Sequence, residues 1–346
     1  MIQAVATHLL PLHLDEGISL FLAEQHGFRV YEGLSQAVAN RQVEFWTSPG
    51  IYHHLGMRMD YSVPLPEDAE GQLASQGYLV LGLGGGDRFF FDHHRKDGGS
   101  EEFTTLDRLF QVLGSQMPLE DRRLWEVLCQ LVRQCDLAGT GELNGLQKAF
   151  INFQHFLGVG PALSWLFDFL GKRISRAKRG LPVSWKPGWS KPRVLAEAEK
   201  QRQEQAALAD YDQSGYFQQN AGPLVFFGAS DYPYFRGLAK NQLEAGGILK
   251  PDTAAAFTIK RTDGRTHISF SNVSPEAISR VVAAVRQAEA SVQGINISGF
   301  NLAQPGVLAG TLEEWHFNPK GPNLQSRDWL SWLTLEQVAN AVHAAL

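Results

Sequence analysis

The stretch YLVLGLGGGDRFFFDHH, residues 78–94, decides the fold of the N-terminal half of the chain. Its first six residues (78–83) are apolar throughout, which is typical of a central strand covered on both faces. A shorter strand is expected at 88–91, directly before Asp92-His93-His94. A carboxylate and two imidazoles therefore follow the end of a strand, where the chemistry of a parallel sheet usually takes place.

Strand and helix patterns alternate around this stretch. In the first half we expect strands at 2–7, 28–31 and 43–46 and helices at 17–26, 34–41, 103–114, 119–135 and 146–170. In the second half we expect strands at 223–227, 254–260 and 266–271, with a hairpin turn at Asp263-Gly264, and helices at 275–290 and 334–345. Strands that alternate with helices predict a parallel α/β sheet in the first half.

The composition changes near the middle of the chain. The 346 residues, 44% of them hydrophobic, suffice for two domains. Between Lys172 and Arg193 lie eight basic residues, three prolines and two tryptophans, with no acidic residue. We interpret this segment as an interdomain linker that leads into a charged helix at 193–209. The alternative is a basic groove in which Trp185 or Trp189 stacks on a nucleic-acid base.

The overall charge and the cysteines limit the class of protein. A net charge of -5 argues against coating long nucleic acid, but allows a small phosphate-bearing substrate held by a local basic patch. Cys129 and Cys135 lie six residues apart in one predicted helix, about 9 Å along its axis and too far for a disulfide. We therefore expect a reduced, cytoplasmic setting. No apolar run approaches the roughly 20 residues that span a bilayer, so we expect a soluble protein without membrane contact.

A second polar cluster lies near the start of the chain. His8, His13, Asp15 and Glu16 are expected in the loop between the first strand and the first helix, too early for a cleavable targeting segment to precede them. Asp15 alone could simply cap that helix, and Asp92-His93-His94 alone could be a polar strand end. Two such clusters at strand ends of one parallel sheet indicate a site for one or two divalent transition metal ions.

These motifs resemble the DHH phosphoesterase superfamily, named for its Asp-His-His motif, and most resemble its melanocyte-proliferating-gene family of nucleases. That family begins with Thr-His and continues with His-x-Asp-Glu, matched here by Thr7-His8 and by residues 13–16. The superfamily's fourth metal-binding aspartate closes a helix, and Asp136 occupies that place. The resemblance implies two Mn²⁺ ions, with Mg²⁺ as an alternative, bound by His8, His13, Asp15, Asp92, His93 and Asp136. It also implies that His94 orients the scissile phosphate or donates a proton to it.

The second half resembles the DHH-associated C-terminal domain. The stretch 231–272 follows that domain's order of helix, strand, turn and strand. The resemblance implies substrate contacts at Arg236, Ser269, Ser271, Asn272 and His316. The implied fold class is α/β, with a parallel-sheet catalytic domain at 1–171, a linker at 172–205 and a smaller α/β substrate-binding domain at 206–346. The active site is then expected in the cleft between the domains.

Two departures from the family bear on catalysis. Gly82 stands where the family has an aspartate that bridges the metals, and Asp60, Asp87 or the pair His53-His54 are candidates to replace it. The segment 299–311 lacks the associated domain's Gly-Gly-His, a role for which His316 is the candidate.

The expected function is a Mn²⁺-dependent phosphodiesterase that acts on short RNA or DNA or on nucleic-acid ends. One alternative is a degenerate relative that binds a nucleotide without cutting it. Another is a phosphodiesterase of cyclic dinucleotides or other small phosphoesters. A homodimer is one option for its assembly.

Overall fold

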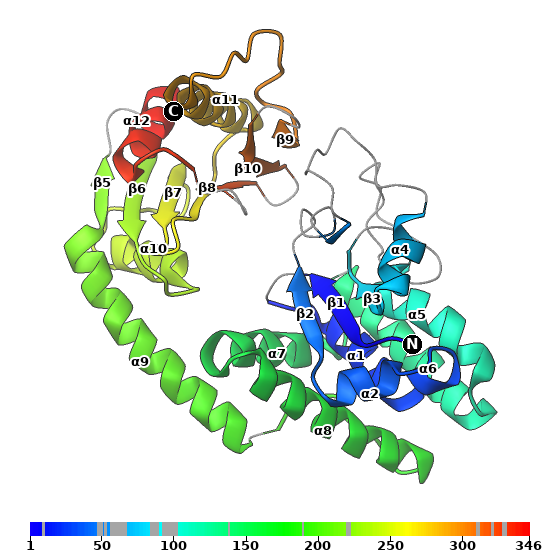
Figure 1. Cartoon of the computed structure of the whole chain (residues 1–346). Helices are drawn as coiled ribbons and strands as arrows, with labels where there is room; N and C mark the ends of the chain where they lie inside the picture. The colour runs from blue at the N-terminus through cyan, green and yellow to red at the C-terminus, as the bar shows by residue number, and fades with distance from the viewer. Residues whose placement is uncertain are drawn as a thin grey trace. The chain divides into compact units, whose positions relative to one another are not determined.

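The computed structural model describes residues 1–8, 11–46, 51, 54–55, 68–83, 90–91, 103–137, 139–188, 190–218, 223–308, 312–319, 322–326 and 331–346. The chain divides into two compact units, of which the first extends to Glu199 and the second contains Lys200 to Leu346. Both units combine helices with a sheet, as Figure 1 shows. The fold class is therefore α/β, as the sequence predicts.

The first unit is built on a four-stranded parallel sheet in the order β2-β1-β3-β4. Its strands are β1 (Ala4–His8), β2 (Val43–Trp46), β3 (Tyr78–Leu81) and β4 (Phe90–Phe91). Thr7 pairs with Phe45 and Leu81, and Leu81 pairs with Phe91. Because all four strands are parallel, their carboxyl ends meet at one edge of the sheet. The apolar stretch near residue 80 forms an interior strand, as predicted.

The helices of the first unit are α1 (Leu14–His26), α2 (Leu34–Ala39), α4 (Ala69–Ser75), α5 (Thr105–Leu113), α6 (Leu119–Asp136), α7 (Asn144–Leu157) and α8 (Val159–Lys178), with 3₁₀ turns at Gly27–Arg29 and Gly114–Gln116. Helix α1 lies at the centre and contacts α2, α5, α6, α7 and α8. At Gly17, an added Cβ would lie 2.8 Å from Leu166 and 2.9 Å from Phe150, so α7 and α8 approach α1 closely there.

Three expectations for this unit are wrong. The strand predicted at 28–31 is a 3₁₀ turn and a bend, because Phe28 is 59% exposed and has no sheet to join. The helix predicted from residue 17 begins at Leu14, so Asp15 and Glu16 belong to its first turn and not to a loop. The single helix predicted at 146–170 is two helices, broken at Gly158, whose φ is +85°.

The basic segment is only partly a connection between elements. Lys172, Arg173, Arg176 and Lys178 lie on α8, inside the first unit, and the last two basic residues lie on α9 (Lys191–Ser214). Trp185 is buried, at 6% exposure, so it is not available to stack on a base and that interpretation is wrong for this residue. Trp189 lies outside the described residues. The two units divide within α9, between Glu199 and Lys200.

The second unit contains a seven-stranded sheet in the order β5-β6-β7-β8-β11-β10-β9. Its strands are β5 (Tyr216–Gln218), β6 (Leu224–Ala229), β7 (Ala255–Lys260), β8 (Thr266–Ser271), β9 (Gly306–Leu308), β10 (Leu312–Asn318) and β11 (Asn323–Ser326), and its helices are α10 (Phe235–Ala245), α11 (Pro275–Gln293) and α12 (Leu335–Ala345). Among the described strand pairs of this sheet, β6 and β7 are the one parallel pair. The β7–β8 hairpin turns at Gly264, whose φ is +86°, as predicted.

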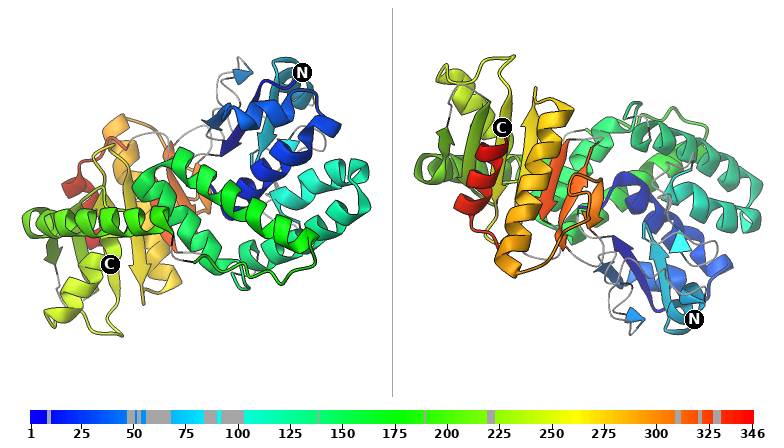
Figure 2. Two further views of the ribbon diagram at one scale, coloured as in Figure 1. Left: turned by 90° about the horizontal axis from the view of Figure 1, so that it is seen from below. Right: turned by 90° about the horizontal axis from the view of Figure 1, so that it is seen from above.

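The two faces of this sheet differ in chemistry. Helices α11 and α12 lie side by side against one face, as Figure 2 shows, and bury an apolar core that includes Ile268, Trp315 and Leu324. Side chains alternate along a strand, so the neighbours of these residues point to the opposite face. There His316 pairs with Gln325, and Gln325 pairs with His267. This second face is polar over β8, β11 and β10.

A buried arginine anchors the described part of the segment 299–311. Arg286 on α11 is fully buried and donates hydrogen bonds to the carbonyls of Leu302, Gln304, Gly306 and Trp315. One side chain thus satisfies four carbonyls. The irregular segment before β9 is therefore held by a tertiary contact.

Two expectations for the chain as a whole can be compared with the structure. Both cysteines are free and buried, in agreement with the spacing argument. None of the helices in the described part of the chain is long and apolar enough to cross a membrane.

Candidate metal site

The site is built on the amino-terminal end of α1. His13 is the residue at the N-cap of this helix, and the Glu16 Oε2 atom accepts a hydrogen bond of 2.8 Å from the His13 backbone N–H. The preceding residue is fixed from α7, because the Gln154 amide both accepts from the Leu12 N–H (2.7 Å) and donates to the Leu12 carbonyl (3.0 Å). These contacts hold the entry to the helix and the first-turn side chains in one arrangement.

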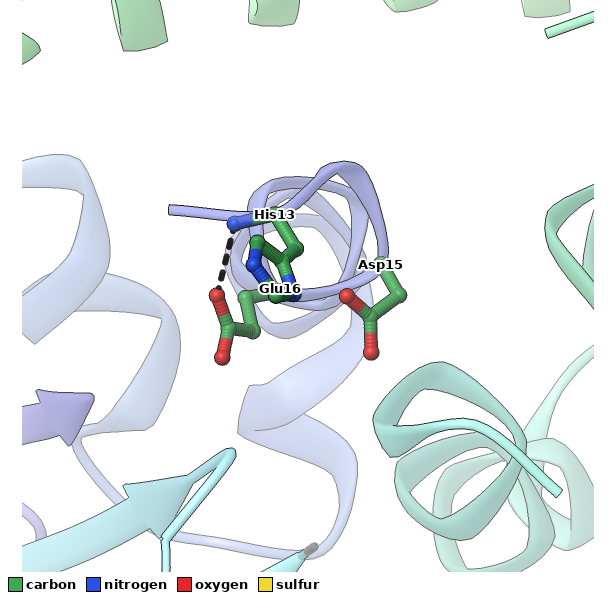
Figure 3. A group of neighbouring side chains, drawn as sticks. All are labelled: His13, Asp15 and Glu16. Atoms are coloured by element: carbon green, nitrogen blue, oxygen red, sulfur yellow. Dashed lines mark hydrogen bonds between the residues drawn. The ribbon is translucent and has the colours of Figure 1, made fainter. Parts of the chain in front are cut away.

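Three of these side chains form a cluster of metal-ligating groups. Figure 3 shows His13, Asp15 and Glu16 around the first turn of α1. One ligand atom from each residue lies within 4.8 Å of the others, and this is a grouping of described residues with the composition of a metal site. Asp15 is 1% exposed and Glu16 is 4% exposed. One imidazole nitrogen and two carboxylates are a suitable donor set for a divalent transition metal ion.

Burial sets the electrostatics of Asp15. It raises the pKa of this carboxyl above its ordinary value, because the charged form is deprived of water. Four interactions work in the opposite direction: the charge of His13, the Glu16 backbone N–H, and the hydroxyl and the backbone N–H of Thr105 at the start of α5. Burial prevails. A carboxylate in such a place is stabilised by a bound cation, so its environment fits a metal site.

Asp136 lies near the same place, as the last residue of α6. The pKa of the neighbouring Cys135 thiol is raised to about 11, first by burial and then by the negative charges of Asp136 and Asp15. Helices α1 and α6 are also in contact. Two carboxylates that the sequence places 121 positions apart thus act on one thiol.

Of the remaining predicted ligands, His8 belongs to a described strand, whereas Asp92 and His93 do not. His8 is the last residue of β1, at the carboxyl edge of the sheet. Asp92, His93 and His94 lie outside the described residues, and so do Asp60, Asp87 and His53. The remaining candidate to replace the missing aspartate, His54, is described. Its ring stacks on Trp46 with 3.8 Å between the centroids, and it is not part of the cluster.

Gly82 has a direct structural relation to the cluster. It follows β3 with a φ of +71°, and a Cβ added there would lie 2.2 Å from the Glu16 Oε1 atom. The Glu16 carboxylate therefore occupies the space that a side chain at position 82 would need. The family resemblance does not imply Glu16 as a ligand, although Glu16 belongs to the His-x-Asp-Glu motif. Only the fold shows that it lies beside Gly82.

In the second unit, most of the predicted substrate contacts lie on the polar face of the sheet. Arg236 on α10 donates to the Ser271 hydroxyl (3.0 Å) and to the Phe270 carbonyl (3.3 Å). Ser269 is buried on β8, at 3% exposure, and His316 lies on β10 beside Gln325. These residues share one surface of the second unit.

Asn272, predicted as a substrate contact, has a structural role in the turn after β8. Its φ is +53°, and its amide donates to the carbonyls of Pro251 (2.7 Å) and Thr253 (3.4 Å). It closes the turn after β8.

A pocket of about 350 Å³ beside Arg236 was missed entirely. Its wall includes Arg261, Arg265, His267 and Gln325, which come from three strands or strand ends. Burial, with the charge of Arg236, lowers the pKa of His267 to about 4. The available sequence signal was the pair of arginines that flank the Asp263-Gly264 turn.

Comparisons with known proteins give no family. No protein-family model matches the sequence, and no curated protein matches it. Among solved structures, an uncharacterized protein from Helicobacter pylori G27 is similar at 10% identity, with a TM-score of 0.29, over 99% of this chain and 100% of the other. An exopolyphosphatase-related protein from Bacteroides fragilis is similar at 11% identity, with a TM-score of 0.33, over 99% of this chain and 90% of the other. Neither similarity is close enough to assign an activity to this chain.

The first prediction concerns Asp15→Asn. We expect Mn²⁺ to raise the melting temperature of the metal-stripped wild type, by the equivalent of about 2.7 kcal/mol at a hundredfold excess over the dissociation constant. The variant should lose this gain. When no metal is present, the variant should be at least as stable as the wild type, because a buried charge is removed. Asp168→Asn is the control, since the Asp168 side chain is 61% exposed and, among the described residues, pairs with Lys172 on α8. A wild-type rise in melting temperature with Mn²⁺ in Asp15→Asn would contradict a metal site at this residue.

The second prediction concerns Gly82→Ala. A side chain at a φ of +71° that also collides with Glu16 should cost about 1–3 kcal/mol of unfolding free energy, measured in urea. Gly139→Ala is the matched control, because its φ is +64° and nothing lies within 4 Å of its added Cβ. In the Gly82→Ala background, replacing Glu16 by Ala should recover the part of the unfolding free energy that the collision removes. Equal losses at positions 82 and 139 would show that Glu16 does not fill this space.

The third prediction concerns pH. The pKa of His267 is about 4 in the folded protein and 6.5 for an imidazole in the unfolded chain. Between these pH values the unfolded chain therefore binds more protons than the folded protein. Stability should therefore fall as the pH drops through this window, and His267→Gln should make that fall shallower. Urea unfolding of both proteins from about pH 8 to about pH 4 measures it. If the unfolding free energy of wild type and of His267→Gln falls equally with pH, His267 is not a buried neutral imidazole.

Proposed function

We propose that this chain is a divalent-metal-dependent phosphodiesterase that acts on short oligonucleotides or on nucleic-acid ends. The observation that carries the proposal is the cluster of His13, Asp15 and Glu16, with ligand atoms within 4.8 Å of one another. It lies at the buried start of α1, directly after β1 of the parallel sheet. We take Mn²⁺ as the cofactor, two ions per chain, with Mg²⁺ as the alternative.

The residues at hand fit such a cofactor. His13, Asp15 and Glu16 would hold one ion, and Asp136 would contribute a carboxylate to a second. His8, Asp92 and His93 complete the proposed set, and His94 is proposed to orient the phosphate or to donate a proton. Bound metal lowers the pKa of a coordinated water and stabilises negative charge on phosphoryl oxygens.

The protein's own contribution is to place these groups before the substrate arrives. The Gln154 clamp on Leu12 and the bond from His13 to Glu16 fix the first turn of α1. Burial of Asp15 and Glu16 excludes bulk water from their side of the site. In a site with little water, electrostatic stabilisation of a charged transition state is stronger than at an exposed surface. We propose in addition that the second unit binds the rest of the substrate.

One observation favours a second candidate function. Gly82 offers no ligand, and Glu16 fills the space beside it. A site with fewer carboxylates than the family uses could bind a nucleotide without hydrolysing it, as a sensor or a subunit. That candidate predicts stabilisation by ligand without turnover.

The test is hydrolysis by the metal-stripped full chain, with and without added Mn²⁺. The substrates are an end-labelled RNA trinucleotide, a cyclic dinucleotide and an RNA of about twenty nucleotides, whose relative rates show which phosphodiester class is preferred. We expect Mn²⁺-dependent release of mononucleotides from the trinucleotide. Asp15→Asn and Asp92→Ala should each lower the rate by at least about 10–100-fold, the loss found when residues supporting a metal ligand are removed. Asp168→Asn is again the control.

Two results decide against the proposal. Hydrolysis at the wild-type rate in Asp15→Asn would remove the cluster from the mechanism. No hydrolysis of any of the three substrates by folded, Mn²⁺-loaded protein would favour the binding function.

A further inference from the structure

We propose that the second unit binds a single phosphate group of a nucleotide in the pocket beside Arg236. This deepens the proposed function, on which it rests for the identity of the substrate. We call this the arginine pocket, and it is lined by Ser230, Tyr232, Pro233, Phe235, Arg236, Ile259, Arg261, Arg265, Thr266, His267, Gln325 and Ser326. All of these residues belong to the second unit.

The lining has the charge of an anion site. It contains three arginines and no carboxylate, in a chain whose overall charge is -5. Guanidinium groups bind phosphate oxygens with two parallel hydrogen bonds, which a carboxylate or a phosphate can accept. The arginines are therefore concentrated here against the general charge of the protein.

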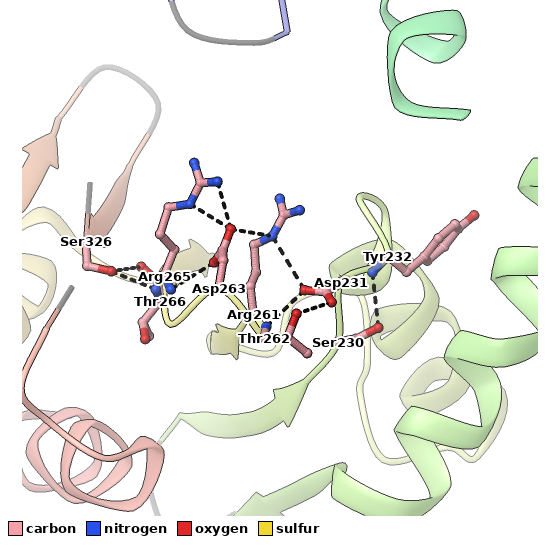
Figure 4. A network of polar contacts seen from close by, with 9 residues as sticks. All are labelled: Ser230, Asp231, Tyr232, Arg261, Thr262, Asp263, Arg265, Thr266 and Ser326. Atoms are coloured by element: carbon pink, nitrogen blue, oxygen red, sulfur yellow. Dashed lines mark hydrogen bonds and ion pairs between the residues drawn. The ribbon is translucent and has the colours of Figure 1, made fainter. Parts of the chain in front are cut away.

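Two of the arginines, Arg261 and Arg265, are held in position by Asp263, which lies between them, as Figure 4 shows. Asp263, in the hairpin turn, accepts from Arg265 Nε (2.9 Å) and Nη2 (2.7 Å) and lies 3.8 Å from Arg261 Nε. Asp231 lies 3.9 Å from the same Arg261 atom and accepts from both the N–H and the hydroxyl of Thr262. Arg261 and Arg265 are thus ordered without a ligand, which lowers the entropy lost on binding.

The carboxyl of Asp263 stays charged in this network. Burial works against its charged form, but the hydrogen bonds and charge of Arg265, together with Arg261, outweigh burial and hold the pKa of Asp263 below its ordinary value. Two carboxylates therefore offset two of the three arginines.

Arg236 is the exception. Among the described residues it has no ion pair with a carboxylate, and burial alone lowers its pKa. Its Nη2 donates to Phe270 and Ser271, while its Nε is buried and has no hydrogen-bond partner among the described residues. A partly buried cation with unused donors is costly unless an anion joins it. One uncompensated positive charge matches one phosphate group better than a polyphosphate or a long nucleic-acid backbone.

The rest of the lining suits the organic part of a nucleotide. Tyr232, Pro233 and Phe235 give the pocket an apolar and aromatic side. His267 is neutral at physiological pH, because burial and the charge of Arg236 keep its pKa at about 4, so its ring can accept or donate one hydrogen bond. A volume of about 350 Å³ is within the range of small-ligand sites.

The test is calorimetric titration of the full chain in the presence of a metal chelator. The three probes are inorganic phosphate, a nucleoside 5′-monophosphate and the corresponding nucleoside. We expect the monophosphate to bind, inorganic phosphate to bind more weakly, and the nucleoside to bind at least about tenfold more weakly than the monophosphate. Phosphate that binds as tightly as the nucleotide would restrict the site to the free anion and overturn the nucleotide assignment.

Variants locate the binding. Arg236→Gln should weaken binding of the monophosphate by about tenfold or more, and Arg236→Lys should lie in between because it keeps the charge but not the planar fork. The matched control is Arg280→Gln on α11, an exposed arginine that donates to the Ala345 carbonyl. Circular dichroism and melting temperature establish that each variant is folded.

Unchanged affinity in folded Arg236→Gln, or no binding of any phosphate-bearing probe by wild type, would overturn the proposal. The chelator separates this result from the hydrolysis test. A chain that binds nucleotide here but hydrolyses nothing with Mn²⁺ keeps the pocket and loses the enzyme. A chain that hydrolyses RNA but gives no binding in chelator keeps the enzyme and loses the pocket.

Discussion

The burial of the first turn of α1 is the constraint on which the first unit depends. Gly17 lets Phe150 and Leu166 approach the helix, and Gln154 fixes the backbone of Leu12 just before it. This packing leaves the Asp15 carboxylate in a place without water, where a negative charge is unfavourable. A fold seldom retains such a group without compensation. His13, the Glu16 backbone N–H and Thr105 offset part of this cost. The proposed divalent cation would offset more of it, and the imidazole and both carboxylates lie together as such a site requires.

Much of the fold could be predicted because its patterns are local. The apolar run at 78–83 became an interior strand, and the alternating elements around it became a parallel sheet. The errors arose where tertiary context decides. The polar pair Asp15-Glu16 was interpreted as loop, yet it forms a buried helical turn. The apolar appearance of 28–31 suggested a strand, but Phe28 points largely to solvent.

The candidate site could be predicted only in part, for the same reason. His13 and Asp15 are found from a motif of neighbouring residues, whereas the contact between Glu16 and Gly82 depends on how α1 lies beside β3. The arginine pocket depends on strand pairing, which brings His267 beside Gln325. No spacing of residues along the chain predicts that pairing. The two proposed sites nevertheless have complementary chemistry, one for cations and one for a phosphate anion, which matches the proposed activity on phosphoesters.

The most direct test of the central claim, that the start of α1 is a metal site, is an anomalous-scattering map from crystals grown with Mn²⁺. The account predicts a manganese peak within about 2.0–2.3 Å of a His13 nitrogen and an Asp15 oxygen, the range of metal–nitrogen and metal–oxygen bonds. It further predicts that the Glu16 carboxylate, beside Gly82, is the other carboxylate next to the manganese ion. A map with strong peaks elsewhere, or with none, and with Asp15 unchanged would contradict it.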